Sequence, residues 1–134
     1  MNLYQMIFKR RSIRKFKYEA VPEQLIKDVL AFADRVATLC PEISTKMEIK
    51  ENIGKDLPVK GLWKVEAPYY LVFYSEEKEG WMMNAGYVLE PVLLYMTGKG
   101  LGTCYLGSTR IPGPEPAGMK TAVAVAFGYP RSLL

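Results

Sequence analysis

The N-terminal part of the chain has two stretches in which apolar residues recur at helical spacing. The first predicts a short helix over residues 2–9. In the second, apolar side chains repeat at i, i+3, i+4 and i+7 across residues 25–37, which predicts an amphipathic helix of about four turns. Pro22 suits the first position of this helix. The polar residues 9–17 therefore lie between two predicted helices.

Further along the chain the pattern changes to short β-prone runs around one apolar helix. Residues 81–97 are apolar nearly all round, so they predict a buried helix that Pro91 should kink, or in which it relieves one backbone bond. PYYLVFYS, residues 68–75, is a continuous run typical of a buried central strand. Three more strands are predicted: a half-exposed one at residues 45–51, and buried ones at 101–108 and 121–128.

The order helix, helix, one or two strands, helix, strand, strand indicates an α+β fold with an antiparallel or mixed sheet flanked by helices. A length of 134 residues allows one domain with a real core, and no repeat or linker divides it. We therefore expect a single domain over residues 1–134. No apolar run approaches the roughly 20 residues that a membrane helix needs.

The composition narrows the possible chemistry. Positive charge is concentrated in residues 9–17, although the formal net charge is only +4. There is no histidine, which removes the usual general base and most zinc sites, so we expect no metal and no catalytic side chain. An enzyme built from this chain would leave the difficult step to a cofactor. Cys40 and Cys104 are two thiols without secretory features, which favours a reducing cytoplasm.

Residues 9–17, KRRSIRKFK, hold six Lys or Arg residues, and we call them the basic segment. Three interpretations stay open on charge alone: a solvated loop, a site for one phosphate, or a patch for a polyanion. Arg10, Arg11 and Arg14 can form forked hydrogen bonds to phosphate oxygens, and Ser12 can add a hydroxyl. The apolar residues inside the run favour a fixed loop over an arm that tracks nucleic acid.

A second candidate is the strand at residues 101–108, where glycines border LGTCYLGS. Glycine in a strand marks either a ligand that approaches the backbone or tight packing. Cys104 lies mid-strand and is expected to be a small core residue, because no base is available to activate it. Glu90 is unusual in an apolar helix, and it either pairs with a basic residue or faces solvent.

Three stretches together resemble the nitroreductase family of flavin-dependent oxidoreductases. The N-terminal helix with KRRSIRKF and VPEQLIKDVLAFA is similar to the family's phosphate-binding signature. NAGYVLEPVLLYMTGKGLGTCYLG is similar to its core helix and flavin-side strand, and AVAVAFGYPR to its late strand. These matches cover about two thirds of the chain, in the family's order.

The resemblance implies a homodimer that binds FMN at the subunit interface. Arg10, Arg11, Ser12 and Arg14 would hold the FMN phosphate and ribityl chain, and the backbone of Leu106, Gly107 and Ser108 would approach the flavin ring. Hydride would pass from NADH or NADPH through the flavin to nitroaromatics, quinones or similar small acceptors. The resemblance implies no nucleic-acid partner and no membrane.

The chain also departs from the usual family pattern. Most members carry an Asn-rich segment ending in Gln-Pro-Trp after the second helix, where this chain has TLCPEISTKMEIKE. The chain looks more like the first half of a rearranged short subgroup, so its FMN site is either incomplete at the C-terminus or completed by another chain. Two alternatives to the enzyme stay open: a non-catalytic FMN- or nucleotide-binding half-domain, and a polyanion-binding protein.

Overall fold

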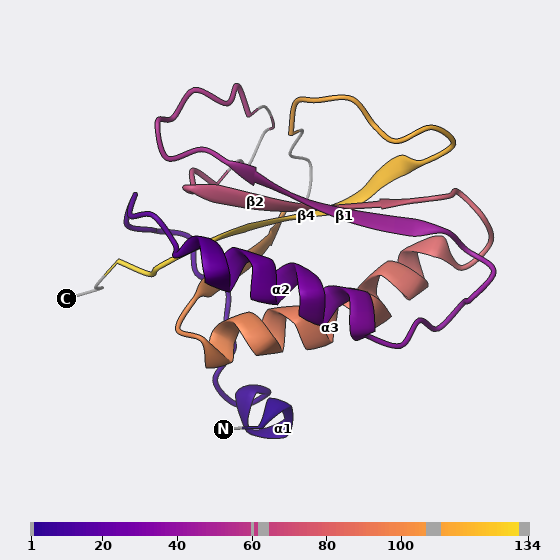
Figure 1. The fold of residues 1–134 in the computed structure, drawn as a ribbon, viewed down its shortest axis with the longest axis horizontal. Helices are drawn as coiled ribbons and strands as arrows, with labels where there is room; N and C mark the ends of the chain where they lie inside the picture. Colours follow the sequence, from indigo (N-terminus) through magenta and orange to yellow (C-terminus); the bar gives the residue numbers. More distant parts are fainter. Residues whose placement is uncertain (1, 60, 62–64, 107–110, 132–134) are drawn as a thin grey trace.

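The computed structural model describes residues 2–59, 61, 65–106 and 111–131. Its elements are α1 (Leu3–Met6), α2 (Glu23–Arg35), β1 (Thr45–Glu51), β2 (Tyr69–Ser75), α3 (Trp81–Gly98), β3 (Gly102–Leu106) and β4 (Lys120–Gly128). The strands form one antiparallel sheet in the order β1-β2-β4-β3 (Figure 1). The predicted α+β class is confirmed, and the sheet is antiparallel rather than mixed.

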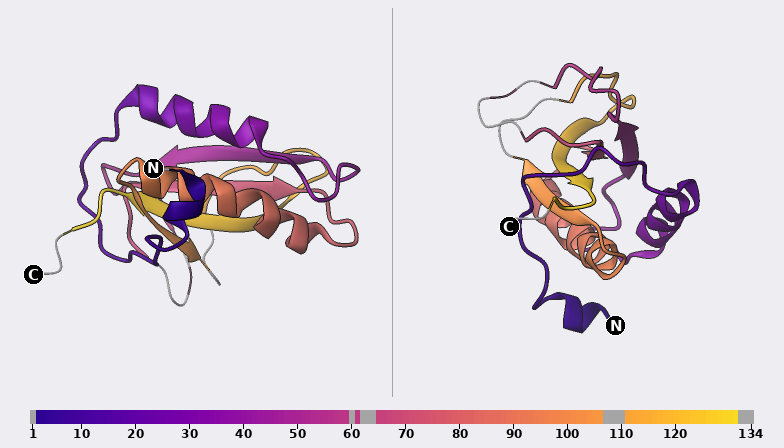
Figure 2. Two further views of the ribbon diagram at one scale, coloured as in Figure 1. Left: turned by 90° about the horizontal axis from the view of Figure 1, so that it is seen from below. Right: turned by 90° about the vertical axis from the view of Figure 1, so that its left-hand side faces the viewer.

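The helices α2 and α3 lie side by side on one face of the sheet (Figures 1 and 2). Every position of β2 is buried, as expected for the central strand that the sequence predicts. Side chains of β2 and β4 pack between the sheet and the two helices, and each fully buried Leu, Val or Phe contributes about 1.5–3 kcal/mol. The main members of this core are Leu71, Phe73, Val125, Phe127, Val29, Leu89 and Leu93.

Loop segments, rather than helices, cover the opposite face of the sheet. Phe16 and Ala67 pack there on Tyr70 of β2 and Cys104 of β3. The Tyr70 hydroxyl donates to the Val65 carbonyl at 2.8 Å, which fixes one of the covering loops. Cys104 is buried and free, so its predicted place in the core is confirmed.

The two N-terminal helices are shorter than their apolar patterns predict. The Asn2 side chain caps α1 by accepting from the Gln5 backbone N–H, but the helix ends at Met6 instead of residue 9. Met6 is the one buried residue of α1, and the following Ile7 and Phe8 are exposed, so little packing supports further turns. The second helix ends at Arg35 because Val36 takes an extended conformation.

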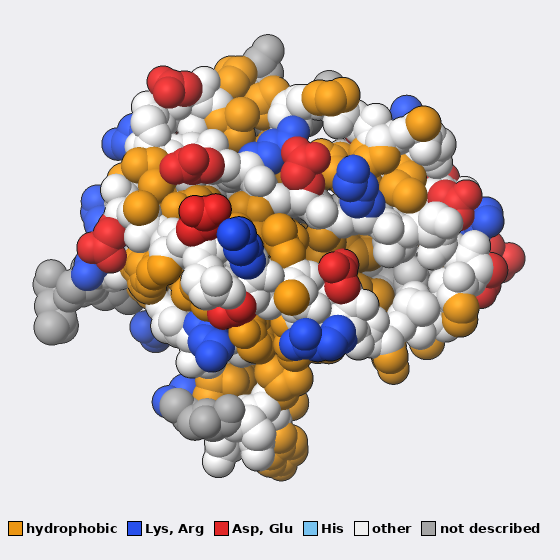
Figure 3. Space-filling model, in the orientation of Figure 1, with side chains coloured by type: hydrophobic (Ala, Val, Ile, Leu, Met, Phe, Trp, Pro, Cys, Tyr) orange, Lys and Arg blue, Asp and Glu red, His pale blue; other side chains and the backbone are white. Residues whose placement is uncertain are grey.

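The long helix α3 runs through Pro91 and buries eight residues, but it is not buried all round as predicted. Met82, Met83 and Tyr87 are exposed large apolar residues on it. Tyr4, Ile7 and Phe8 of the projecting N-terminal region are exposed as well, and Figure 3 shows apolar side chains on this lower part of the molecule. Among the described residues, no helix is long and apolar enough to cross a membrane.

Candidate functional site

The basic segment wraps around the outer edge of β3. Arg10 lies on the helix side of the sheet, whereas Phe16 is buried on the opposite face. Between them, the Ile13 N–H donates to the Thr103 carbonyl at 2.9 Å, and Ser12 forms a parallel bridge to the same residue. The segment then pairs with the chain beyond β4 through a bridge from Phe16 to Pro130. Backbone pairing with β3 and with the residues just after β4 thus holds the segment in place.

Gly102 makes this crossing possible. A Cβ atom at this position would lie 2.9 Å from both Cβ and Cγ1 of Ile13 and 3.0 Å from its Cγ2. Real Cβ atoms almost never come so close to another heavy atom. The glycine that borders the predicted strand therefore leaves room for the Ile13 side chain. At this position the glycine serves tight packing, one of the two predicted alternatives.

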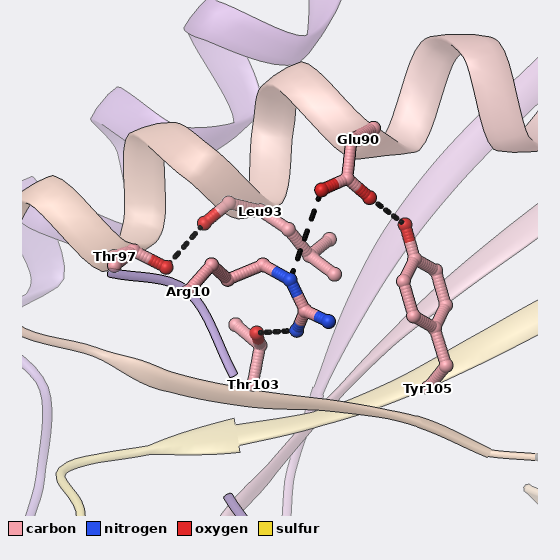
Figure 4. A network of polar contacts seen from close by, with 6 residues as sticks. All are labelled: Arg10, Glu90, Leu93, Thr97, Thr103 and Tyr105. Carbon is pink, nitrogen blue, oxygen red and sulfur yellow. Dashed lines mark hydrogen bonds and ion pairs between the residues drawn. The ribbon is translucent and has the colours of Figure 1, made fainter. Parts of the chain in front are cut away.

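Arg10 is tied into a network that joins the basic segment to α3 and β3 (Figure 4). Its Nη1 donates to Thr103 Oγ1 at 3.0 Å, and its Nε lies 3.7 Å from Glu90 Oε1. The guanidinium also lies over the Tyr105 ring, 5.6 Å from the centroid, and the Tyr105 hydroxyl donates to Glu90 Oε2 at 3.0 Å. Glu90 therefore pairs with a basic residue, as one predicted alternative has it, and it also faces solvent, since its side chain is 49% exposed.

The phenol of Tyr105 stays protonated in this network. Burial raises its pKa above the usual value, and the Glu90 charge and hydrogen bond act in the same direction, against a smaller opposing effect of Arg10. A phenol that keeps its proton donates continuously to Glu90 and leaves the other carboxylate oxygen to Arg10. The network thus fixes the guanidinium rather than leaving it in solvent.

Arg11, Ser12 and Arg14 have a different environment from Arg10. All three are exposed, and neither arginine forms an ion pair with any residue that the structure describes. They line what we call the edge cleft, together with Ile13, Lys15, Lys17, Pro130 and Arg131. A cleft with five cationic side chains and a hydroxyl is suited to bind a phosphate.

The structure brings the basic segment next to β3, the strand predicted to approach the flavin ring. Ser12 bridges Thr103, and Leu106 lies three positions further along β3, about 10 Å away at the usual rise per residue. Leu106 is buried on the loop-covered face. Gly107 and Ser108 lie outside the described residues. A ligand that contacts both the segment and the end of β3 would have to be extended.

Sequence reasoning missed Arg131 as a member of the site. Its backbone N–H donates to the Lys15 carbonyl at 3.0 Å, which places it beside the basic segment although it follows β4. The available signal was the motif FGYPR, in which a basic residue follows a buried strand. The bridge from Pro130 to Phe16 could not be inferred from either stretch alone.

A family model described as "Putative TM nitroreductase" matches residues 2–134. The chain belongs to this nitroreductase family. The family resemblance found in the three sequence stretches is therefore confirmed. No curated protein matches the chain.

Solved structures with the fold of this chain share little sequence with it. An FMN-dependent nitroreductase from Clostridium difficile R20291 is 17% identical, with a TM-score of 0.77, over 99% of this chain and 92% of that one. A "putative NADH oxidase" from Clostridium acetobutylicum is 20% identical, with a TM-score of 0.69, over 94% and 87%. A "putative nitroreductase" from Thermotoga maritima is 23% identical, with a TM-score of 0.66; the alignment covers 98% of this chain but 50% of that protein.

Proposed function

We propose that this nitroreductase is an FMN-dependent oxidoreductase that takes reducing equivalents from NADH or NADPH. The observation that carries the proposal is the edge cleft beside β3, where Ser12 lies among cations that form no ion pair with a described residue. The family membership and the FMN-dependent structural neighbour support it. We propose that residues 1–134 act as one domain and work in a reducing cytoplasm, where Cys40 and Cys104 stay free.

The described residues fit the phosphate end of FMN. Arg11 and Arg14 supply forked donors without a competing carboxylate, and Ser12 adds a hydroxyl. Arg10 is not among the residues that line the edge cleft. Thr103 and Glu90 hold its guanidinium on the helix side of β3, so its predicted contact with FMN stays a prediction. At the ring end, Leu106 and the predicted Gly107 and Ser108 would present backbone groups to the flavin.

When bound, the flavin supplies a ring that accepts a hydride from the reductant and gives it to a nitroaromatic, quinone or similar acceptor. The protein's part is to bind and orient, since the sequence has no histidine. The alternative is a non-catalytic half-domain that binds FMN or a nucleotide without turnover. This chain aligns with half of the Thermotoga maritima protein, so the test has to distinguish a half-domain that only binds from an enzyme.

An absorbance titration tests the proposal. FMN is added to the purified protein, and the visible flavin band is followed after gel filtration and then after NADH or NADPH under anaerobic conditions. Retained absorbance that bleaches with either reductant supports the enzyme. Retained absorbance without bleaching supports the non-catalytic half-domain. A colourless protein after gel filtration contradicts the enzyme and the FMN-binding form of the half-domain.

The residue prediction is tested with Arg14→Ala. Losing a charge-assisted hydrogen bond to phosphate should weaken FMN binding by about 1.5–3 kcal/mol, which is roughly 10- to 150-fold in Kd. Lys27→Ala is the matched control, because Lys27 is an exposed cation paired with Glu23 on α2. Flavin fluorescence quenching measures both constants. Equal Kd values for the two variants would place the phosphate elsewhere.

We further propose that the nitroreductase forms a homodimer through its exposed apolar surface. Leu3 of α1 and Tyr87, Pro91 and Leu94 of α3 line one apolar groove. Tyr87 is 51% exposed and Met83 is 70% exposed. Apolar side chains that gather on an exposed surface mark an interaction site. Analytical ultracentrifugation should find a dimer that Met83→Glu converts to a monomer. A monomeric parent protein contradicts this assignment.

A further inference from the structure

A second cleft lies beside the edge cleft and shares part of its lining. We call it the Lys55 cleft, and its walls are Arg14, Lys15, Phe16, Tyr18, Lys55, Val65, Glu66 and Arg131. Four cationic side chains therefore face one carboxylate. None of the four forms an ion pair with a described residue. Such an imbalance is unfavourable in the empty cleft and favours an anionic ligand.

The backbone holds three of these cations in place. Arg131 N–H donates to the Lys15 carbonyl at 3.0 Å, and the neighbouring Lys17 N–H donates to the Tyr129 carbonyl at 2.9 Å. Arg14 belongs to the same stretch, next to the buried anchor Phe16. These backbone hydrogen bonds keep the two basic stretches side by side, although their charges repel each other.

The fourth cation, Lys55, is placed by a strained turn. Its φ of 59° is the one left-handed backbone angle of a non-glycine residue in the described part of the chain. The turn is held by Asn52, which is only 8% exposed: its carbonyl accepts from the Lys55 N–H at 3.0 Å, and its Oδ1 accepts from the Leu57 N–H at 2.9 Å. Strain of this kind persists where surrounding contacts over-determine it and often marks a functional site.

The side chain of Lys55 is oriented toward the basic stretches. Its Nζ lies over the Tyr18 ring, 4.3 Å from the centroid, and both residues line the cleft. Burial raises the pKa of the Tyr18 phenol, and the neighbouring Tyr70 and Glu66 act in the same direction. Tyr18 therefore keeps its proton and can donate to an anion together with Lys55.

We propose that the Lys55 cleft binds a second phosphate group, separate from the FMN phosphate, and that this group is the 2′-phosphate of NADPH. Arg14, Lys15 and Arg131 line both clefts, whereas Lys55 and Tyr18 line only this one. Lys55 and Tyr18 would therefore be the second phosphate's own donors, and the shared cations would lie between the two phosphates. NADH has no phosphate of this kind, so the cleft would make NADPH the preferred reductant. This inference rests on the proposed function because it assumes a nicotinamide nucleotide as reductant.

The probe is 2′,5′-ADP, which carries the 2′-phosphate on adenosine, and the comparison is 5′-AMP, both titrated by calorimetry. We expect 2′,5′-ADP to bind at least ten-fold more tightly than 5′-AMP. Lys55→Asn should abolish this difference while leaving the Kd for FMN within two-fold. Asparagine tolerates the left-handed conformation, so this variant removes the charge without adding backbone strain.

Lys99→Asn is the matched control, because Lys99 is an exposed lysine whose Nζ also lies over a tyrosine ring, 5.4 Å from the Tyr95 centroid, outside the cleft. It should leave the 2′,5′-ADP Kd unchanged. Equal affinities for 2′,5′-ADP and 5′-AMP would overturn the proposal. Inorganic phosphate that binds as tightly as 2′,5′-ADP would also overturn it, because the cleft would then bind free phosphate.

Two further results separate this inference from the proposed function. FMN that competes with 2′,5′-ADP would show that the cleft holds the flavin phosphate, which overturns the second site. In the FMN-loaded protein, Lys55→Asn should raise the KM for NADPH about ten-fold and leave the KM for NADH unchanged. If neither reductant bleaches the flavin, the proposed function fails, whereas selective binding of 2′,5′-ADP would still support the second phosphate site.

Discussion

The crossing of the basic segment over β3 gives a sharp test in Gly102→Ala. The added methyl group would meet three atoms of Ile13 at 2.9–3.0 Å. The segment has little freedom to yield, because the Ile13 N–H is hydrogen-bonded to the Thr103 carbonyl at 2.9 Å. Overpacking of this kind typically costs about 1–3 kcal/mol of the free energy of unfolding.

The expected shift in Tm follows from the size of the chain. For 134 residues, the entropy of unfolding near Tm is about 0.28 kcal/mol per kelvin, so Tm should fall by about 4–11 °C. Gly86→Ala is the control: Gly86 lies inside α3, and a Cβ there meets nothing within 4 Å. Alanine should stabilise the helix at that position by about 0.5–1 kcal/mol, raising Tm by about 2–4 °C.

Differential scanning calorimetry should show a lower Tm for Gly102→Ala and a higher Tm for Gly86→Ala than for the parent protein. A double mutant, Gly102→Ala with Ile13→Ala, removes Cγ1 and Cγ2 of Ile13 but keeps its Cβ, so it relieves part of the clash. It should lose less stability than the sum of the single mutants, with a coupling of about 1 kcal/mol. Additive losses within about 0.5 kcal/mol, or a Gly102→Ala variant as stable as the parent, would refute the close approach of these residues.

Two other predictions concern stability. The pKa of Tyr105 is raised in the folded protein, whereas in the unfolded chain it is near 10, so the unfolded chain releases this proton at lower pH. The contribution of Tyr105 to the free energy of unfolding is therefore fully present below about pH 10. It is lost as the pH rises through the folded pKa. Urea unfolding between pH 8 and 11.5 should show a shallower fall for Tyr105→Phe, and equal slopes would contradict the network. Asn84 is fully buried, and its Oδ1 accepts from Thr38 Oγ1 at 2.7 Å and from two backbone N–H groups at 3.0 Å, so Asn84→Ala should cost about 1–3 kcal/mol in the same assay. A loss below about 0.5 kcal/mol would mean that solvent replaces these bonds.

The elements with a strong burial pattern were predictable from sequence. β2 is a run of consecutive apolar and aromatic residues because the sheet buries both of its faces, and α2 shows the helical repeat because only one of its faces packs on the core. The extent of α1 was not predictable, since Ile7 and Phe8 continue the apolar pattern but stay exposed, with Phe8 packed edge-on against Tyr4 of α1. Local pattern cannot report whether a partner surface exists.

The candidate site was predictable in part. The basic segment stands out by charge, and its position between two helices follows from the flanking repeats. The residues that contact it could not be predicted, because Thr103 and Pro130 pair with it from distant parts of the chain. Lys55 lies in a loop without periodicity, and its left-handed conformation depends on the buried Asn52 side chain rather than on any turn signal at the lysine itself.

The pairing of Phe16 with Pro130 has a consequence for how ligands and folding are linked. Both clefts lie along a seam that joins the first and last described stretches of the chain. A folding intermediate in which either stretch is still detached would lack both clefts, and with them the proposed phosphate sites. Any ligand held at this seam therefore stabilises only the completed fold, and it would slow fraying from both ends of the chain at once.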